Sequence, residues 1–291
     1  MVSKVVLDVI PPFTLLSLRL ALAAVVLGAA AWLKARLPRS AVYASTHPSV
    51  DPLLSALAAG LVGYGFSLGL QFVGTRLSTA ANAALVTSAS PAFIVLFAFL
   101  ILREAVTVPR LLALILASLG VLVVIDPRTA SLSRQALWGN LALAGAALTW
   151  GLYSVLVKRA AGAGVSTLTF TLAAILGGLP LSLPAAALEL RAAGLGKITP
   201  GIVWGVIYLG VVSTALAAYL WNKSFELLDA GLASLFFFAQ PVVGAALGWW
   251  LLGETLSAGF FWGGALIGIS IFLAAWRTET VRLESYLRKR K

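Results

Sequence analysis

AANAALVTSASPAFIVLFAFLILRE, residues 80–104, and AGLASLFFFAQPVVGAALGWWLLGE, residues 230–254, share one pattern 150 residues apart. Each is a long apolar run with a proline at the same place, Pro91 and Pro241, and each ends on a carboxylate, Glu104 and Glu254. Such regular spacing in a membrane-type sequence indicates an internal repeat. Duplicated halves are how many secondary transporters build a binding site.

The rest of the chain has the composition of a membrane protein. It is 60% hydrophobic and 11% charged, with a mean hydropathy of +1.00, whereas soluble domains carry about 25% charged residues. A helix that crosses the hydrocarbon needs about 20 apolar residues. We therefore predict an all-α polytopic membrane protein with nine spans, at residues 12–33, 52–74, 79–102, 106–125, 138–157, 165–188, 202–221, 230–252 and 258–276.

The net charge of +11 fits either membrane orientation or an anionic partner such as nucleic acid. Threading the nine spans with the C-terminus inside puts most Lys and Arg residues on the cytoplasmic side, which favours orientation and no nucleic-acid partner. We expect a multi-pass protein of the bacterial inner membrane. Its basic tail, residues 277–291, would lie in the cytoplasm against anionic lipid headgroups.

The repeat divides the chain into two halves. The first, residues 1–127, holds four spans; a polar linker follows at 128–135, and the second half, 136–276, holds five. The two copies with the matching prolines are the third and eighth spans, so they run in opposite directions, as in inverted repeats. We expect that the first helix of a five-plus-five design is missing, because VSKVVLDVIPP at the start resembles the tail of the span at 138–157. A start codon assigned too late, a shortened sequence or a native nine-span protein would each account for this.

Polar and aromatic residues inside spans are candidates for lining a central cavity. Tyr64 and Gln71 share one helical face, and adding 150 to each number gives Thr214 and Trp221, which also share a face. Hydrogen bonding between helices is the competing role for such residues. The expected substrate-cavity residues are Tyr64, Gln71, Asn82, Ser88, Trp150, Tyr153, Thr214, Trp221, Phe237 and Gln240.

Three further residues within spans have expected roles. Pro91 and Pro241 remove a backbone hydrogen bond, so each is either a gating hinge or a packing bend. Ser90 and Gln240, which precede them, could satisfy the freed carbonyls. Arg19 is the intramembrane charge, and it would either pair with a substrate carboxylate or backbone carbonyls, or extend to the interface.

The residue inventory disfavours catalysis. The chain has no Cys and one His, and no span contains paired carboxylates, so we expect no catalytic residue, no metal site, no cofactor and no enzyme activity. The absence of a carboxylate in the middle of a span favours facilitated diffusion or exchange over a proton relay inside the membrane. The mostly neutral and aromatic cavity set favours a zwitterionic or apolar small-molecule substrate, with large neutral amino acids first. Small-residue spacings such as Gly244 to Gly248 allow close helix packing or a homodimer.

Four stretches together resemble the EamA-type transporters of the drug/metabolite transporter superfamily. They are LLSLRLALAAVVLG around Arg19, TSASPAFIVLFAFLILRE, FFFAQPVVGAALGWWLLGE and the glycine-bearing GGALIGISIFLAAW. The resemblance covers essentially the whole chain. It implies a ten-helix transporter with a central cavity and both termini in the cytoplasm, which moves small metabolites such as amino acids, usually outward. The alternatives are an accessory membrane subunit without transport of its own and, ranked last, a membrane-embedded enzyme.

Overall fold

All regular elements in the described part of this computed structural model are helical. The structure describes residues 2–36, 52–78, 83, 86–125, 134–240, 242–243, 246, 250 and 259–273. The helices that pack in one compact unit are α1 (Val2–Leu7), α2 (Pro12–Arg36), α3 (Pro52–Gly60), η1 (Leu61–Ser67), α9 (Thr167–Ala193), α10 (Pro200–Gly210), η4 (Val211–Leu216) and α11 (Ala217–Leu227). Those of the second unit are α6 (Ser90–Phe97), η2 (Ala98–Leu102), α7 (Val108–Ile125), α12 (Ala230–Leu235) and η5 (Phe236–Phe238). Helices α4 (Leu68–Leu77) and α8 (Arg134–Gly162) contribute residues to both.

The prediction of an all-helical, multi-pass membrane protein is confirmed. Five continuous helices are long and apolar enough to cross a membrane: Pro12–Arg36, Pro52–Leu77, Leu137–Gly162, Thr167–Ala193 and Pro200–Leu227. Shorter apolar helices cover Ser90–Leu102, Val108–Val123 and Gly259–Leu273 in the described residues. The span predicted at 230–252 lies partly outside the described residues, and so does the start of the one at 79–102.

Helix α2 shows how the sequence sets a span and its end. Its 25 residues are apolar up to the last turn, which carries Lys34 and Arg36. The Arg36 guanidinium lies 3.7 Å from the centre of the Trp32 ring, a cation–π contact. An aromatic ring beside basic residues at a helix end is typical of the membrane interface.

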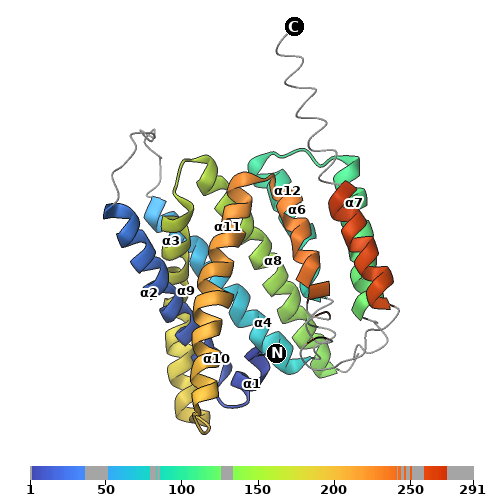
Figure 1. Ribbon diagram of the computed structural model, residues 1–291. Coiled ribbons are helices and arrows are strands. Elements are labelled where there is room, and N and C mark those ends of the chain that lie inside the picture. Colours follow the sequence, from blue (N-terminus) through green and yellow to red (C-terminus); the bar gives the residue numbers. More distant parts are fainter. Residues whose placement is uncertain are drawn as a thin grey trace. The chain divides into compact units, whose positions relative to one another are not determined.

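Unit 1, which comprises Met1–Val73 and Leu152–Leu227, is built around α9. Helix α2 packs along α9 on one side and against α10 and η4 on another, as Figure 1 shows at its left. Glycines bring α3 and α9 together backbone to backbone: a Cβ at Gly60 would overlap the Ala174 carbonyl, and one at Gly177 would overlap the Leu57 carbonyl. No side chain fits at either position without moving a helix.

Unit 2, which comprises Gly74–Gly151 and Leu228–Lys291, has its own apolar core. Helix α12 packs against α6 and α7. The buried side chains of the core of unit 2 are Ala113, Ala117, Val121, Leu232, Leu235, Phe238 and Ile267. A Cβ at Gly120 would lie 2.7 Å from the Ile267 side chain, so α7 approaches the helix at 259–273 closely.

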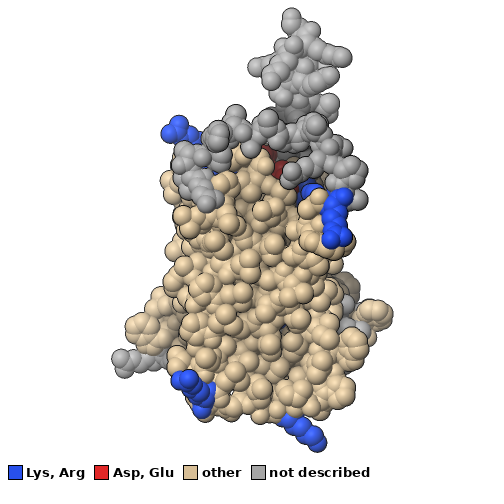
Figure 2. Space-filling view, turned by 90° about the vertical axis from the view of Figure 1, so that its left-hand side faces the viewer, with Lys and Arg blue, Asp and Glu red and all other residues tan. Residues whose placement is uncertain are grey.

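The surface of the molecule has the polarity expected in a bilayer. On the face drawn in Figure 2, Lys and Arg side chains lie only toward the two ends, and uncharged residues fill the wide belt between them. Large apolar side chains such as Val25, Trp204 and Trp262 are at least 70% exposed. Lipid is the solvent that accepts such a surface without cost.

Candidate functional site

Two π-helical segments interrupt the long helices of unit 1 at matching places. Segment η1 starts at Leu61 and η4 starts at Val211, 150 residues later, the offset of the sequence repeat. In a π-helix one extra residue enters the turn, and such segments are frequent at functional sites. Tyr64 lies in η1 and its repeat partner Thr214 lies in η4.

The η4 segment holds the intramembrane arginine. The Thr214 hydroxyl donates to the Leu209 carbonyl at 2.7 Å, and it accepts a hydrogen bond from Arg19 Nε at 3.0 Å. Thr214 is 5% exposed, whereas the Arg19 side chain is half-buried. Neither of the two ion pairs within the described ranges, Arg110–Asp229 and Lys223–Glu226, includes Arg19.

A buried hydrogen-bond network joins η1 to three other helices of unit 1. The Tyr153 hydroxyl donates to the Tyr64 hydroxyl at 3.2 Å and accepts from Asn222 Nδ2 at 2.8 Å. Asn222 Nδ2 also donates to Thr171 Oγ1 at 2.9 Å, and Thr171 donates to the Thr167 carbonyl at 2.6 Å. The Tyr64 and Tyr153 rings meet edge-on with centroids 5.2 Å apart. Polar groups buried in this way fix the mutual position of η1, α8, α9 and α11.

Asn222 was not among the residues predicted from the sequence. The predicted span ended at Trp221, whereas the helix continues to Leu227. An asparagine next to the end of a long apolar run was the available signal, because such residues hydrogen-bond across helices in membranes.

Three of the expected cavity residues therefore have their hydroxyls engaged inside unit 1. Tyr64, Tyr153 and Thr214 are 3%, 0% and 5% exposed. Gln71 and Trp221 of the same unit are half-buried. Trp221 Nε1 donates to Ser154 Oγ at 3.4 Å. Part of the Trp221 side chain remains accessible.

The remaining expected cavity residues belong to unit 2. Ser88, Trp150 and Phe237 are half-buried and Gln240 is exposed, while Asn82 lies outside the described residues. Within the phenylalanine run, Phe238 is buried in the core of the unit and Phe237 keeps an accessible side.

Pro91 lies at the start of a helix. The chain turns at Ser88 and Ala89, and Pro91 occupies the first turn of α6, where a missing N–H costs little. Ser90 Oγ donates to the Thr87 carbonyl at 2.7 Å. The Ser90 hydroxyl thus has a carbonyl partner next to Pro91, and its role toward a carbonyl freed by the proline stays a prediction. Pro241 lies outside the described residues.

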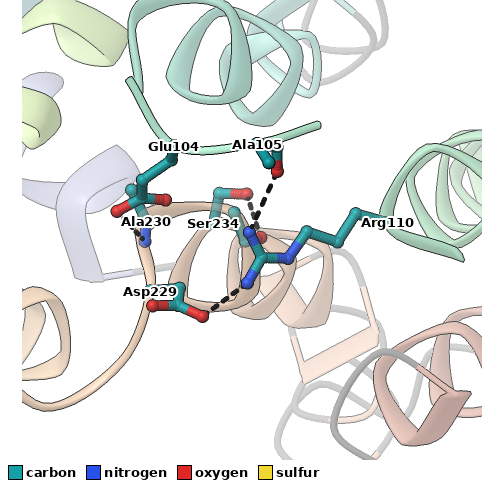
Figure 3. Close-up of polar contacts among 7 residues, drawn as sticks. Glu104, Ala105, Arg110, Asp229, Ala230 and Ser234 are labelled. Carbon is teal, nitrogen blue, oxygen red and sulfur yellow. Dashed lines mark hydrogen bonds and ion pairs between the residues drawn. The ribbon is translucent and has the colours of Figure 1, made fainter. Parts of the chain in front are cut away.

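Charged residues at one end of unit 2 connect two inter-helix segments (Figure 3). Arg110 of α7 forms an ion pair with Asp229, the residue before α12, and its Nη1 donates to the Ala105 carbonyl at 3.4 Å. Glu104 Oε1 accepts from the backbone N–H of Ala230 at 3.4 Å. The repeat-matched carboxylate Glu104 thus ties the end of η2 to the start of α12.

A second carboxylate performs a similar task in unit 1. Glu189 Oε2 accepts from the backbone N–H groups of Phe13 at 2.7 Å and Thr14 at 3.1 Å. These are unpaired donors at the start of α2, and a carboxylate there also complements the helix dipole. Among the described residues no group of three or more His, Asp or Glu side chains is placed to hold a metal ion.

Comparison with known proteins gives a consistent result. The profile of the family described as "EamA-like transporter family" matches residues 1–126 and 137–276. The chain is 31% identical over 200 residues to an uncharacterized transporter, YyaM, of Bacillus subtilis (strain 168), covering 65% of this chain and 63% of that one. It is 29% identical over 202 residues to the riboflavin transporter of Brucella anthropi, covering 66% of each. The chain thus spans a little under two thirds of those two relatives.

A solved crystal structure has the same fold. It superposes with a TM-score of 0.78 at 21% identity, over 96% of this chain and 92% of that one.

Proposed function

This chain belongs to the EamA-like transporter family, and from that premise we propose that it is a secondary transporter which moves its solute by alternating access. It is a multi-pass membrane transporter of small solutes and not an enzyme. The mechanism, the substrate class and the direction of transport are the proposed part.

The observation that carries the proposal is the pair of π-helical segments, η1 and η4. They start 150 residues apart, at the offset of the sequence repeat, and both lie in the interior of long apolar helices. Interrupted helices at corresponding places of two repeats are the usual pointer to a binding site in secondary transporters. We propose that the two halves are inverted repeats, at 1–127 and 136–276, and that Gln71 and Trp221, the cavity candidates of unit 1 with accessible surface, contribute to the solute pathway.

The proposed solutes are amino acids or related neutral and apolar molecules, with export as the direction. Within unit 1, Trp221 is half-buried and offers aromatic surface, and Gln71 offers a neutral hydrogen-bonding group. Ring surface with a few uncharged polar groups suits a large neutral amino acid better than a multiply charged phosphate. We also propose a bacterial inner-membrane location, with the basic tail in the cytoplasm.

Uptake by the purified protein in liposomes tests this function. The substrates are labelled L-phenylalanine, L-leucine and L-tryptophan, with riboflavin included because one relative carries that name. Saturable uptake of an amino acid above that of protein-free liposomes supports the proposal. If every solute enters no faster than it enters protein-free liposomes, an accessory subunit without transport of its own is favoured. If riboflavin is taken up and no amino acid is, riboflavin-like solutes replace amino acids as the proposed substrate class.

A further inference from the structure

We infer that Arg19 binds a carboxylate of the transported solute, which deepens the proposed function and rests on it. The site consists of the Arg19 guanidinium on α2 and the Thr214 hydroxyl in η4, both in unit 1. It selects solutes with a carboxylate, such as amino acids, over apolar solutes and amides.

The hydrogen bonds of Arg19 orient its guanidinium. Nε donates to Thr214 Oγ1 at 3.0 Å, and Thr214 is itself fixed by its bond to the Leu209 carbonyl. Among the described residues, this is the bond that anchors the guanidinium, and it uses the nitrogen nearest the helix. The two Nη groups form the outer fork. A planar fork held in this way matches the two oxygens of a carboxylate.

The charge of Arg19 lacks a compensating protein charge in the described ranges. Both ion pairs found there lie elsewhere, at Arg110–Asp229 and Lys223–Glu226. Arg19 is the eighth residue of α2, about 10 Å along the helix from Pro12, and its side chain is half-buried. A cation at this depth is costly unless it meets an anion or water, and residues of this kind are functional by default.

An oxyanion could come from the solute or from the phosphate of a membrane lipid. We assign it to the solute because Arg19 is anchored toward η4, within the interior of a long span, rather than at a helix end where phosphates gather. The proposed ligand group is therefore a carboxylate.

Matched acid and amide ligands test the site directly. Affinity of the purified protein in neutral detergent is measured by ligand-dependent thermal stabilisation, with 3-phenylpropanoate against 3-phenylpropanamide and L-phenylalanine against L-phenylalaninamide. The wild type should bind each acid more tightly than its amide. Arg19→Gln should weaken acid binding about tenfold to a hundredfold and leave amide binding unchanged, because a charge-assisted bidentate contact is lost.

Two further variants distinguish the planar geometry of the guanidinium from its positive charge, and both from a nonspecific effect on folding. Arg19→Lys keeps the charge without the planar fork and should fall between the wild type and Arg19→Gln. Arg76→Gln removes an exposed arginine in the last turn of α4 and should bind as the wild type does. If the wild type binds acid and amide with equal affinity, or binds neither, the inference is overturned. This outcome needs no variant, so it does not depend on whether a variant folds.

Binding to lipid nanodiscs and uptake into liposomes distinguish a lipid site from a solute site, and failure of the site from failure of the proposed function. Arg19-dependent stabilisation by phosphatidylglycerol nanodiscs over phosphatidylcholine nanodiscs, with no preference for acids, would assign the site to lipid and overturn the inference. Arg19-dependent acid binding without transport supports the site and contradicts the proposed function. Equal amino-acid uptake by the wild type and Arg19→Gln contradicts the site and leaves the function standing.

Discussion

The hydroxyl of Tyr153 lies 3.2 Å from the hydroxyl of Tyr64, and this bond joins α8 to the π-helical segment η1 inside unit 1. Both side chains are almost fully buried, and Asn222 and Thr171 extend the contact to α11 and α9. The segment where the helix departs from regular α geometry is thus held by side-chain hydrogen bonds.

Tyr153→Phe should lower the free energy of unfolding by about 0.6 kcal/mol, the average measured for interhelical hydrogen bonds in a membrane protein, and by no more than about 1.7 kcal/mol, the largest value measured. The loss arises because Asn222 and Tyr64 keep buried polar groups with one partner fewer. Unfolding by SDS in mixed micelles measures it. Tyr208→Phe, at a tyrosine 48% exposed, is the matched control and should change little. Equal effects of the two substitutions would mean that the network contributes nothing specific.

Gly177→Ala should destabilise the protein by about 1–3 kcal/mol, because the new Cβ would overlap the Leu57 carbonyl and force α3 and α9 apart. Gly28→Ala is the control: Gly28 is also inside a helix, and a Cβ there would meet nothing within 4 Å. That variant should be neutral or up to about 1 kcal/mol more stable, since alanine favours the helix. Thermal unfolding in detergent compares them. A Gly177→Ala protein as stable as Gly28→Ala would contradict the close backbone contact.

The Arg110–Asp229 ion pair should show a small coupling energy of about 0.2–1 kcal/mol in a double-mutant cycle of Arg110→Ala and Asp229→Ala. The value is small because the side chains are 19% and 43% exposed, so water screens the attraction. Raising the salt concentration should reduce it further. A coupling of zero at low salt would mean that the pair in Figure 3 does not stabilise the start of α12.

Replacing both Pro91 and Pro241 by Ala should slow transport turnover, because we propose that the prolines act as hinges. Pro91 occupies the first turn of α6, so its removal leaves the hydrogen-bond pattern of that helix intact. Pro109→Ala is a matched control, since Pro109 is likewise the second residue of its helix, α7. Turnover numbers in liposomes provide the measurement. An unchanged turnover in the double variant would remove the hinge hypothesis.

The positions of the membrane helices could be predicted from the sequence, because a run of about 20 consecutive apolar residues matches the thickness of the hydrocarbon core. The helix ends were harder to predict. Asn222 and Glu226 lie beyond the apolar run at 202–221, yet the helix continues through them and packs their polar groups against α9. Hydropathy ends a span where the polar residues begin, even when one of them, here Asn222, is buried between helices.

Other features depend on distant residues and leave no local signal. Glu189 reaches the start of α2 across a separation of 176 positions, and Asp229 pairs with Arg110 across 119. A π-helical turn adds one residue to an apolar run and leaves its composition unchanged, so η1 and η4 were not predicted. By contrast, the bond from Ser90 to the Thr87 carbonyl follows a local pattern: Thr87 lies four residues before Pro91, and Ser90 lies directly beside Pro91. The cavity-lining roles stay predictions.

Counterflow in proteoliposomes is a direct test of alternating access, because it requires one binding site that opens in turn to the two sides of the membrane. Vesicles loaded with millimolar unlabelled L-phenylalanine are diluted into trace labelled L-phenylalanine, and internal label is followed over time. The account predicts a transient overshoot of label above equilibrium, absent from protein-free vesicles. Label that rises only to equilibrium, with no effect of the internal amino acid, would contradict an alternating-access carrier for this solute.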